Sequence, residues 1–89
     1  MRTGQTVMTI GIANRLADDE QFAKGVLNAV AMYKAEDWGD LPEEDKQMNE
    51  EALHTKDRIL GAYNIGSDRI WIITDAGHEV TTILFPSEY

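Results

Sequence analysis

The 89-residue sequence has no cysteine, only two prolines and two histidines, and half as many basic as acidic residues. Without cysteine, disulfide scaffolds and cysteine-ligated zinc sites are excluded. No apolar run approaches the roughly 20 residues that a membrane-spanning helix needs, and we expect no signal peptide, because the first residues are polar. We therefore expect one small soluble domain over residues 1–89, located in the cytoplasm.

Basic residues are few and scattered, which argues against direct binding of nucleic acid. Lys and Arg total 8 against 16 Asp and Glu, so the formal net charge is −8. Proteins that bind DNA or RNA cluster Lys and Arg against the phosphates, and anionic membranes attract the same residues. A basic protein partner is favoured instead, because opposite surface potentials speed encounter. The alternative is that the negative charge only keeps a small protein soluble.

Catalytic motifs are missing as well. His54 and His78 lie in no metal-ligand spacing, and no P-loop, dinucleotide-binding or nucleophile-elbow motif occurs. Asp75 and His78 flank a turn where they could hydrogen-bond, but hairpin loops often hold Asp and Gly for conformational reasons alone. We expect a protein that is not an enzyme, with no cofactor and no metal site.

The first third of the chain predicts a strand and a helix. Thr6–Ile12 alternates, with its even-numbered positions apolar, and predicts the first strand. After a connection over residues 14–17, Asp18 and Gln21 form a capping-box pattern that predicts the start of a helix. Gly25 within this helix favours close packing against a neighbouring element. The predicted core stripe consists of Phe22, Val26, Ala29, Val30 and Tyr33, widened by Leu27 and Ala31.

A second helix is predicted from Asp40 to about Thr55. Asp40 is its predicted N-cap, Glu43 completes the capping box, and Pro42 lies in the first turn, where its missing N–H costs nothing. Its apolar stripe is thin, so the helix must lie on the surface with a wide polar face. That stripe consists of Leu41, Met48, Ala52 and Leu53.

The last third changes to a period of two residues and predicts three strands. These strands cover residues 58–65, 69–74 and 79–85, with turns at Gly66 and Gly77. The predicted order is β-α-α-β-β-β, and the last three strands form an antiparallel meander. The sequence therefore predicts a two-layer α+β domain with an antiparallel sheet and helices on one face.

The helix-free face of such a sheet is a candidate interface. Residues 69–74 are apolar on both faces, and Trp71 and Ile73 share one of them. If that face is uncovered, a second copy or another partner could bury it; otherwise the twisted sheet and its loops cover it. One functional hypothesis is therefore a non-enzymatic accessory or regulatory module that self-associates, as a homodimer, through its sheet.

Half of the carboxylates lie in one stretch of the chain. From Glu36 to Glu51 there are eight acidic residues against one base, Lys46. Like charges at this density cost stability, and DNA presents one negative charge per roughly 1.7 Å of its axis. The functional interpretation is a mimic that occupies the nucleic-acid site of a basic partner, and the alternative is a capped, soluble surface helix. The candidate partner-binding residues, with Trp38 as an aromatic anchor, are Asp37, Trp38, Asp40, Glu43, Glu44, Asp45, Glu50 and Glu51.

The second half of the chain also carries a series of short motifs. They are Trp38-Gly39-Asp40-Leu41, Glu44-Asp45-Lys46, Asn49, Ala52-Leu53, Arg58-Ile59-Leu60, Ala62-Tyr63, Ile70-Trp71-Ile72-Ile73-Thr74, Val80-Thr81-Thr82-Ile83-Leu84, Pro86 and Glu88-Tyr89. With these motifs, the chain from Trp38 to Tyr89 resembles a family of short, uncharacterised "plasmid-related" proteins of bacterial plasmids and mobile elements. It departs from the family pattern at residues 77–79, which read Gly-His-Glu where the family usually has Asp-Arg-Ser.

The resemblance implies a mobile-element or phage context and supplies no activity and no catalytic residue. Together with the acidic stretch, it makes evasion of host defence the sharpest hypothesis. The protein would bind and inhibit a nucleic-acid-handling host protein, such as a restriction or CRISPR effector.

Overall fold

Helices and strands are segregated along the chain, with the helices near the start and most strands near the end. The computed structural model describes residues 1–89 and has an α+β fold, as the sequence predicts. Three helices precede the C-terminal strands where two were predicted. The elements are β1 (Gln5–Met8), α1 (Ile10–Asp18), α2 (Glu20–Lys34), α3 (Glu43–Thr55), β2 (Ile59–Ile65), β3 (Asp68–Thr74), β4 (Val80–Leu84) and a 3-10 turn (Pro86–Glu88).

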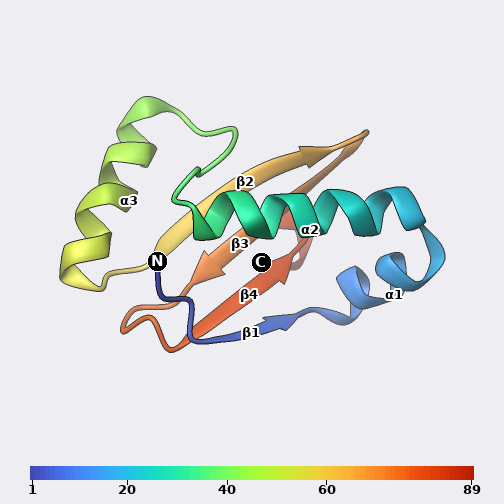
Figure 1. Cartoon of the computed structure of the whole chain (residues 1–89), viewed down its shortest axis with the longest axis horizontal. Coiled ribbons are helices and arrows are strands. Elements are labelled where there is room, and N and C mark those ends of the chain that lie inside the picture. Colours follow the sequence, from blue (N-terminus) through green and yellow to red (C-terminus); the bar gives the residue numbers. More distant parts are fainter.

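The four strands form one sheet in the order β1-β4-β3-β2 (Figure 1). The predicted antiparallel meander of β2, β3 and β4 is confirmed. The prediction of an all-antiparallel sheet is wrong, because β1 pairs with β4 in the parallel direction. Between β1 and β2 the chain passes through all three helices and reaches the opposite edge of the sheet, so β1 is not part of the meander.

The first predicted strand is too long. β1 ends at Met8, and α1 begins at Ile10, so the strand predicted to Ile12 and the connection over residues 14–17 are wrong. The Thr9 hydroxyl accepts the Ile12 N–H at 3.3 Å and caps the helix. Ile12 is then fully buried from a helix rather than from a strand.

Helix α2 begins one residue later than predicted. The Asp19 carboxylate, not that of Asp18, caps the helix by accepting the Phe22 N–H at 3.0 Å, and this bond holds the pKa of Asp19 below its usual value. Leu27 is 71 % exposed and Ala31 is also exposed, so the predicted widening of the core stripe is wrong. Val30 is half-buried, and the buried residues of the stripe are Phe22, Val26, Ala29 and Tyr33.

The core lies between α2 and one face of the sheet (Figure 1). Within it, a chain of hydroxyl groups joins elements that are far apart in the sequence. The Tyr33 hydroxyl of α2 lies 2.5 Å from the Thr74 hydroxyl, which lies 2.8 Å from that of Thr81, and Thr81 donates to the Thr3 carbonyl at 2.6 Å. Because every member has a partner, these buried polar groups fix the position of α2 over β3 and β4 at little energetic cost.

The predicted close packing at Gly25 is confirmed. A Cβ atom at Gly25 would lie 2.4 Å from the Cγ2 atom of Ile65, at the end of β2. The glycine therefore lets α2 approach the sheet more closely than any other residue would allow.

Helix α3 lies beyond the β2 edge of the sheet rather than over its face (Figure 1). Asn49 of α3 covers part of that edge: its Nδ2 donates to the Leu60 carbonyl at 2.8 Å, and its Oδ1 accepts the Leu60 N–H at 3.3 Å. The segment before α3 covers the next position, because Ala62 donates to the Trp38 carbonyl at 3.0 Å and accepts the Asp40 N–H at 2.8 Å. The outward backbone groups of β2 are thus occupied at two successive positions.

The face of the sheet opposite α2 carries no helix. Trp71 and Ile73 lie on this face, since they alternate with the core residues of β3. The Tyr89 ring packs edge-to-face on Trp71 with centroids 5.7 Å apart, and Ile73 is only 5 % exposed. Trp71 is half-buried, so side chains and the C-terminal residue cover much of this face.

Candidate functional site

The eight acidic residues predicted from the sequence lie on α3 and on the loop before it. Glu43, Glu44 and Asp45 form the first turn of the helix, whose N-cap is Pro42 and which has no side-chain cap. Carboxylates at this end oppose the positive end of the helix dipole and stabilise the helix in place of a cap. Three of the eight charges therefore also support α3 itself.

The structure corrects the prediction that Asp40 caps α3. Its Oδ2 accepts hydrogen bonds from Arg69 Nη1 at 2.8 Å and from Asn64 Nδ2 at 3.1 Å, and its own carbonyl accepts from Arg69 Nη2 at 3.0 Å. The guanidinium, followed by the amide, holds the pKa of the Asp40 carboxyl below its usual value. This carboxylate is therefore occupied by β2 and β3 and is not free for the helix.

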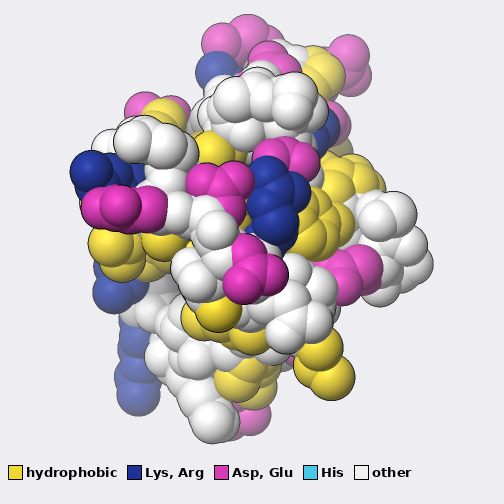
Figure 2. Space-filling model, turned by 90° about the vertical axis from the view of Figure 1, so that its right-hand side faces the viewer, with side chains coloured by type: hydrophobic (Ala, Val, Ile, Leu, Met, Phe, Trp, Pro, Cys, Tyr) yellow, Lys and Arg dark blue, Asp and Glu magenta, His cyan; other side chains and the backbone are white.

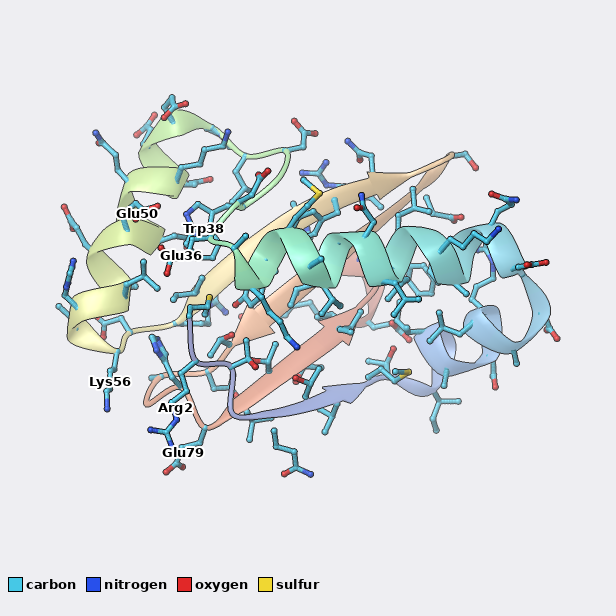
Figure 3. All side chains as sticks on the ribbon, viewed as in Figure 1. Arg2, Glu36, Trp38, Glu50, Lys56 and Glu79 are labelled. Carbon is cyan, nitrogen blue, oxygen red and sulfur yellow. The ribbon has the colours of Figure 1, made fainter.

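Trp38 is not an exposed anchor, and that expectation is wrong. Its side chain is 3 % exposed and packs edge-to-face on Tyr33, with centroids 5.6 Å apart. Its Nε1 donates to Glu50 Oε1 at 3.1 Å, and Figure 3 shows Trp38 between α2 and α3, with Glu50 to its left on α3. The pair joins α3 to the core, and the Trp38 N–H is used within the chain.

Other acids of the stretch also have contacts within the chain. Asp37 Oδ1 accepts the Gly39 N–H at 3.1 Å, and the Glu36 carboxylate lies 3.8 Å from the N-terminal ammonium group. The acids whose carboxylates make no hydrogen bond or ion pair within the chain are Glu43, Glu44, Asp45 and Glu51. We refer to these four residues as the α3 acidic surface.

A groove of about 370 Å³ lies between α3 and the start of β2, beside the α3 acidic surface. Met48, which was predicted to be in the apolar stripe, is instead 66 % exposed at this groove. Asp57 also lines the groove, although it lies outside the predicted acidic stretch. The lining combines apolar side chains with three carboxylates and one base, Arg58. Apolar and acidic groups together match a Lys or Arg side chain, which has an apolar stem and a cationic end. The groove is lined by Leu41, Asp45, Met48, Asn49, Glu51, Ala52, Thr55, Asp57, Arg58 and Leu60.

Several acidic groups elsewhere on the surface are paired with basic groups. At the end of the molecule seen in Figure 2, basic and acidic side chains lie side by side. Arg15 of α1 contacts Asp19 at 3.3 Å and Asp68 at 2.5 Å. The four carboxylates of the α3 acidic surface have no such partner, and they are gathered on one helix.

A second hollow lies near the N-terminus and has mixed charge. This cleft of about 590 Å³ is lined by two bases, Arg2 and Lys56, and two acids, Glu36 and Glu79. Figure 3 shows Arg2, Lys56 and Glu79 at one corner of the molecule. The cleft includes the turn at residues 77–79, where the sequence departs from the plasmid-related pattern.

In this cleft the ring of His78 makes no hydrogen bond to the Asp75 side chain. The backbone N–H of His78, not its ring, contacts Asp75, donating to the Asp75 carbonyl at 2.9 Å. The ring Nε2 lies 2.8 Å from the Asp57 carbonyl. No group of three or more His, Asp or Glu side chains is arranged to hold a metal ion, and no helix combines the length and apolarity needed to cross a membrane.

Comparison of the chain with known protein families, with curated proteins and with solved structures finds no match to any of them. The similarity to plasmid-related proteins therefore stays a prediction.

Proposed function

We propose that this chain is a non-catalytic acidic protein that binds a basic, nucleic-acid-handling protein through the α3 acidic surface and blocks its nucleic-acid site. One observation carries the proposal. Glu43, Glu44, Asp45 and Glu51 are free of partners within the chain, while the other four acids of the stretch have contacts within it.

Uncompensated charge of this kind favours a partner of opposite sign. Clustered carboxylates in a chain of net charge −8 attract a basic groove over a distance of about one Debye length, and they speed its encounter. A groove that holds phosphates presents Lys and Arg in rows, and the carboxylates of α3 offer similar acceptors. The groove beside Met48 adds a place for the stem of one such side chain.

The class of partner rests on the plasmid-related resemblance. Proteins of plasmids and phages meet the restriction and CRISPR effectors of their host, and these effectors hold nucleic acid in basic channels. The proposed target is therefore a host defence protein of this kind, inhibited by occupation of its nucleic-acid site.

Affinity capture from a bacterial host lysate tests this proposal. The tagged protein is compared with a variant that carries Glu43→Gln, Glu44→Gln and Asp45→Asn. Because these changes also weaken the helix dipole interaction, the free energy of unfolding of each variant is measured, and capture is done where both are folded. The matched control carries Asp18→Asn, Glu20→Gln and Glu79→Gln, which change the net charge equally but lie outside the α3 acidic surface.

The expected result is a basic nucleic-acid-binding protein that the natural chain and the matched control retain at low salt. The α3 variant should not retain this protein. High salt should release it from the natural chain and the matched control, and added duplex DNA should compete with both of them for it. Equal capture by the α3 variant and the control, or retention that DNA does not affect, would contradict the proposal.

A further inference from the structure

Strand β1 is the outer edge of the sheet that no other segment covers. It lies along the bottom of Figure 1, and all four of its residues are exposed. Gln5 donates to the Glu79 carbonyl at 2.9 Å and Thr9 donates to the Ile83 carbonyl at 3.1 Å, so alternate residues face β4. In a parallel pair the residues between them, Thr6 and Met8, direct their N–H and C=O groups away from the sheet.

Two features that usually protect an edge strand, charged side chains and proline, are missing from β1, so its short length of 4 residues is the protection that it retains. Natural sheets blunt their edges with charged side chains or proline. Residues 3–14 contain neither, in a chain that is 27 % charged. Three large apolar side chains are exposed in this segment: Val7 at 36 %, Met8 at 43 % and Ile10 at 80 %. Figure 2 shows hydrophobic side chains toward the bottom of the molecule, the side on which β1 lies.

We propose that two copies of this chain pair through β1 in the antiparallel direction and form one continuous sheet. The β1 edge carries no acidic side chain that would attract a basic partner, so a second copy with the same uncharged edge is the occupant that fits it. Each copy has a net charge of −8, so like copies can approach closely only where the surface is uncharged. The β1 edge meets this condition, and the two α3 helices then lie at the far ends of the joined sheet, since β2 is the opposite edge.

The backbone restricts the pairing to one register. Gly4 has a positive φ of 62° and Ile10 begins a helix, so only the residues between them are extended. Pairing each Thr6 with the Met8 of the second copy uses every free backbone group of the strand in hydrogen bonds. The two Val7 side chains then lie opposite each other at the centre, in a non-hydrogen-bonded pair.

This register is testable by disulfide trapping, because the chain has no cysteine of its own. Val7→Cys places two thiols at a position where the Cα atoms of an antiparallel pair lie about 4.5 Å apart, which suits a disulfide. The matched control is Leu27→Cys, another exposed apolar position, on α2. Val7→Cys should form a covalent dimer about tenfold faster or more than Leu27→Cys, because pairing raises the local thiol concentration.

A second variant keeps the proposal falsifiable without cysteine chemistry. Val7→Lys places like charges opposite each other, and its exposed site should tolerate lysine without unfolding. Sedimentation over a range of concentrations should show a reversible dimer for the natural chain, strengthened by salt, and a monomer for Val7→Lys. Equal rates of disulfide formation at the two cysteine positions, a natural chain that stays monomeric, or a dimer that survives Val7→Lys would overturn the proposal.

The two proposals are independent in their readouts. Salt should strengthen pairing of like copies and weaken binding of a basic partner. Val7→Lys leaves the α3 acidic surface intact, so its capture of a partner tests the first proposal alone.

Discussion

At the scale of single residues, Asn49 makes the hydrogen bonds to the edge of β2 that a neighbouring strand would otherwise make. Its amide group makes two hydrogen bonds to Leu60 and is itself almost fully buried. Asn49→Ala should leave the Leu60 N–H and C=O without these partners and lower the free energy of unfolding by about 1–3 kcal/mol. Urea denaturation followed by circular dichroism measures this change.

Gln47→Ala is the matched control for this change, because Gln47 is exposed on the same helix. It should alter the free energy of unfolding by less than about 0.5 kcal/mol. If the two substitutions cost the same, the covering role assigned to Asn49 is wrong.

The acidic residues show which part of the site could be predicted. The excess of charge between Glu36 and Glu51 follows from the sequence alone. Which carboxylates are free does not, because their partners are distant: Arg69 holds Asp40 across 29 residues. The burial of Trp38 depends in the same way on α2 and α3 coming together, and no local pattern encodes that.

At the scale of secondary-structure elements, prediction succeeded where a period extends over many residues. The strands of the meander were predicted to within about two residues, because alternation and glycine-containing turns agree there. It failed between residues 6 and 18, where a short alternating run fits a strand and a helix start equally well. The Thr9 cap decides between them, and a single threonine is a weak signal in a sequence.

The packing of α2 on β2 makes a prediction at this same scale. Gly25→Ala should improve helix propensity by about 1 kcal/mol, yet the new Cβ would collide with Ile65. We expect a net loss of stability of about 1–3 kcal/mol from overpacking.

A double-mutant cycle isolates the collision. In the background of Ile65→Ala, which removes the colliding atoms, Gly25→Ala should become neutral or stabilising by urea denaturation. Additive effects of the two substitutions would mean that Gly25 is not held by contact with Ile65.

At the scale of the whole molecule, two buried tyrosines link stability to alkaline pH. Burial raises the pKa of Tyr33 to about 12, although its hydrogen bond with Thr74 opposes the shift. Burial, followed by the nearby Tyr33 and Asp37, also raises the pKa of Tyr63. Each phenol therefore favours its neutral form in the folded state more than in the unfolded state, where its pKa is about 10.

The sign of the pH dependence follows from these shifts. Below about pH 10 the phenols are neutral in both the folded and the unfolded state, and their contribution to the free energy of unfolding is fully present. Above about pH 10 the unfolded state loses the phenol protons first, so the free energy of unfolding falls as the pH rises toward 12. The slope for each tyrosine is at most about 1.4 kcal/mol per pH unit. Urea midpoints on either side of pH 10 measure it, and Tyr63→Phe should make the decline shallower. An unchanged slope would show that Tyr63 does not take part.

The covering of the β2 edge by Asn49 and the segment before α3 limits how far any assembly can grow. A sheet with two bare edges can add copies without end and become a fibre. Here one edge is occupied from within the chain, so pairing through β1 uses the remaining edge of both copies. Such an association closes at two with twofold symmetry, and a small acidic protein with an unprotected strand is thereby kept from polymerising.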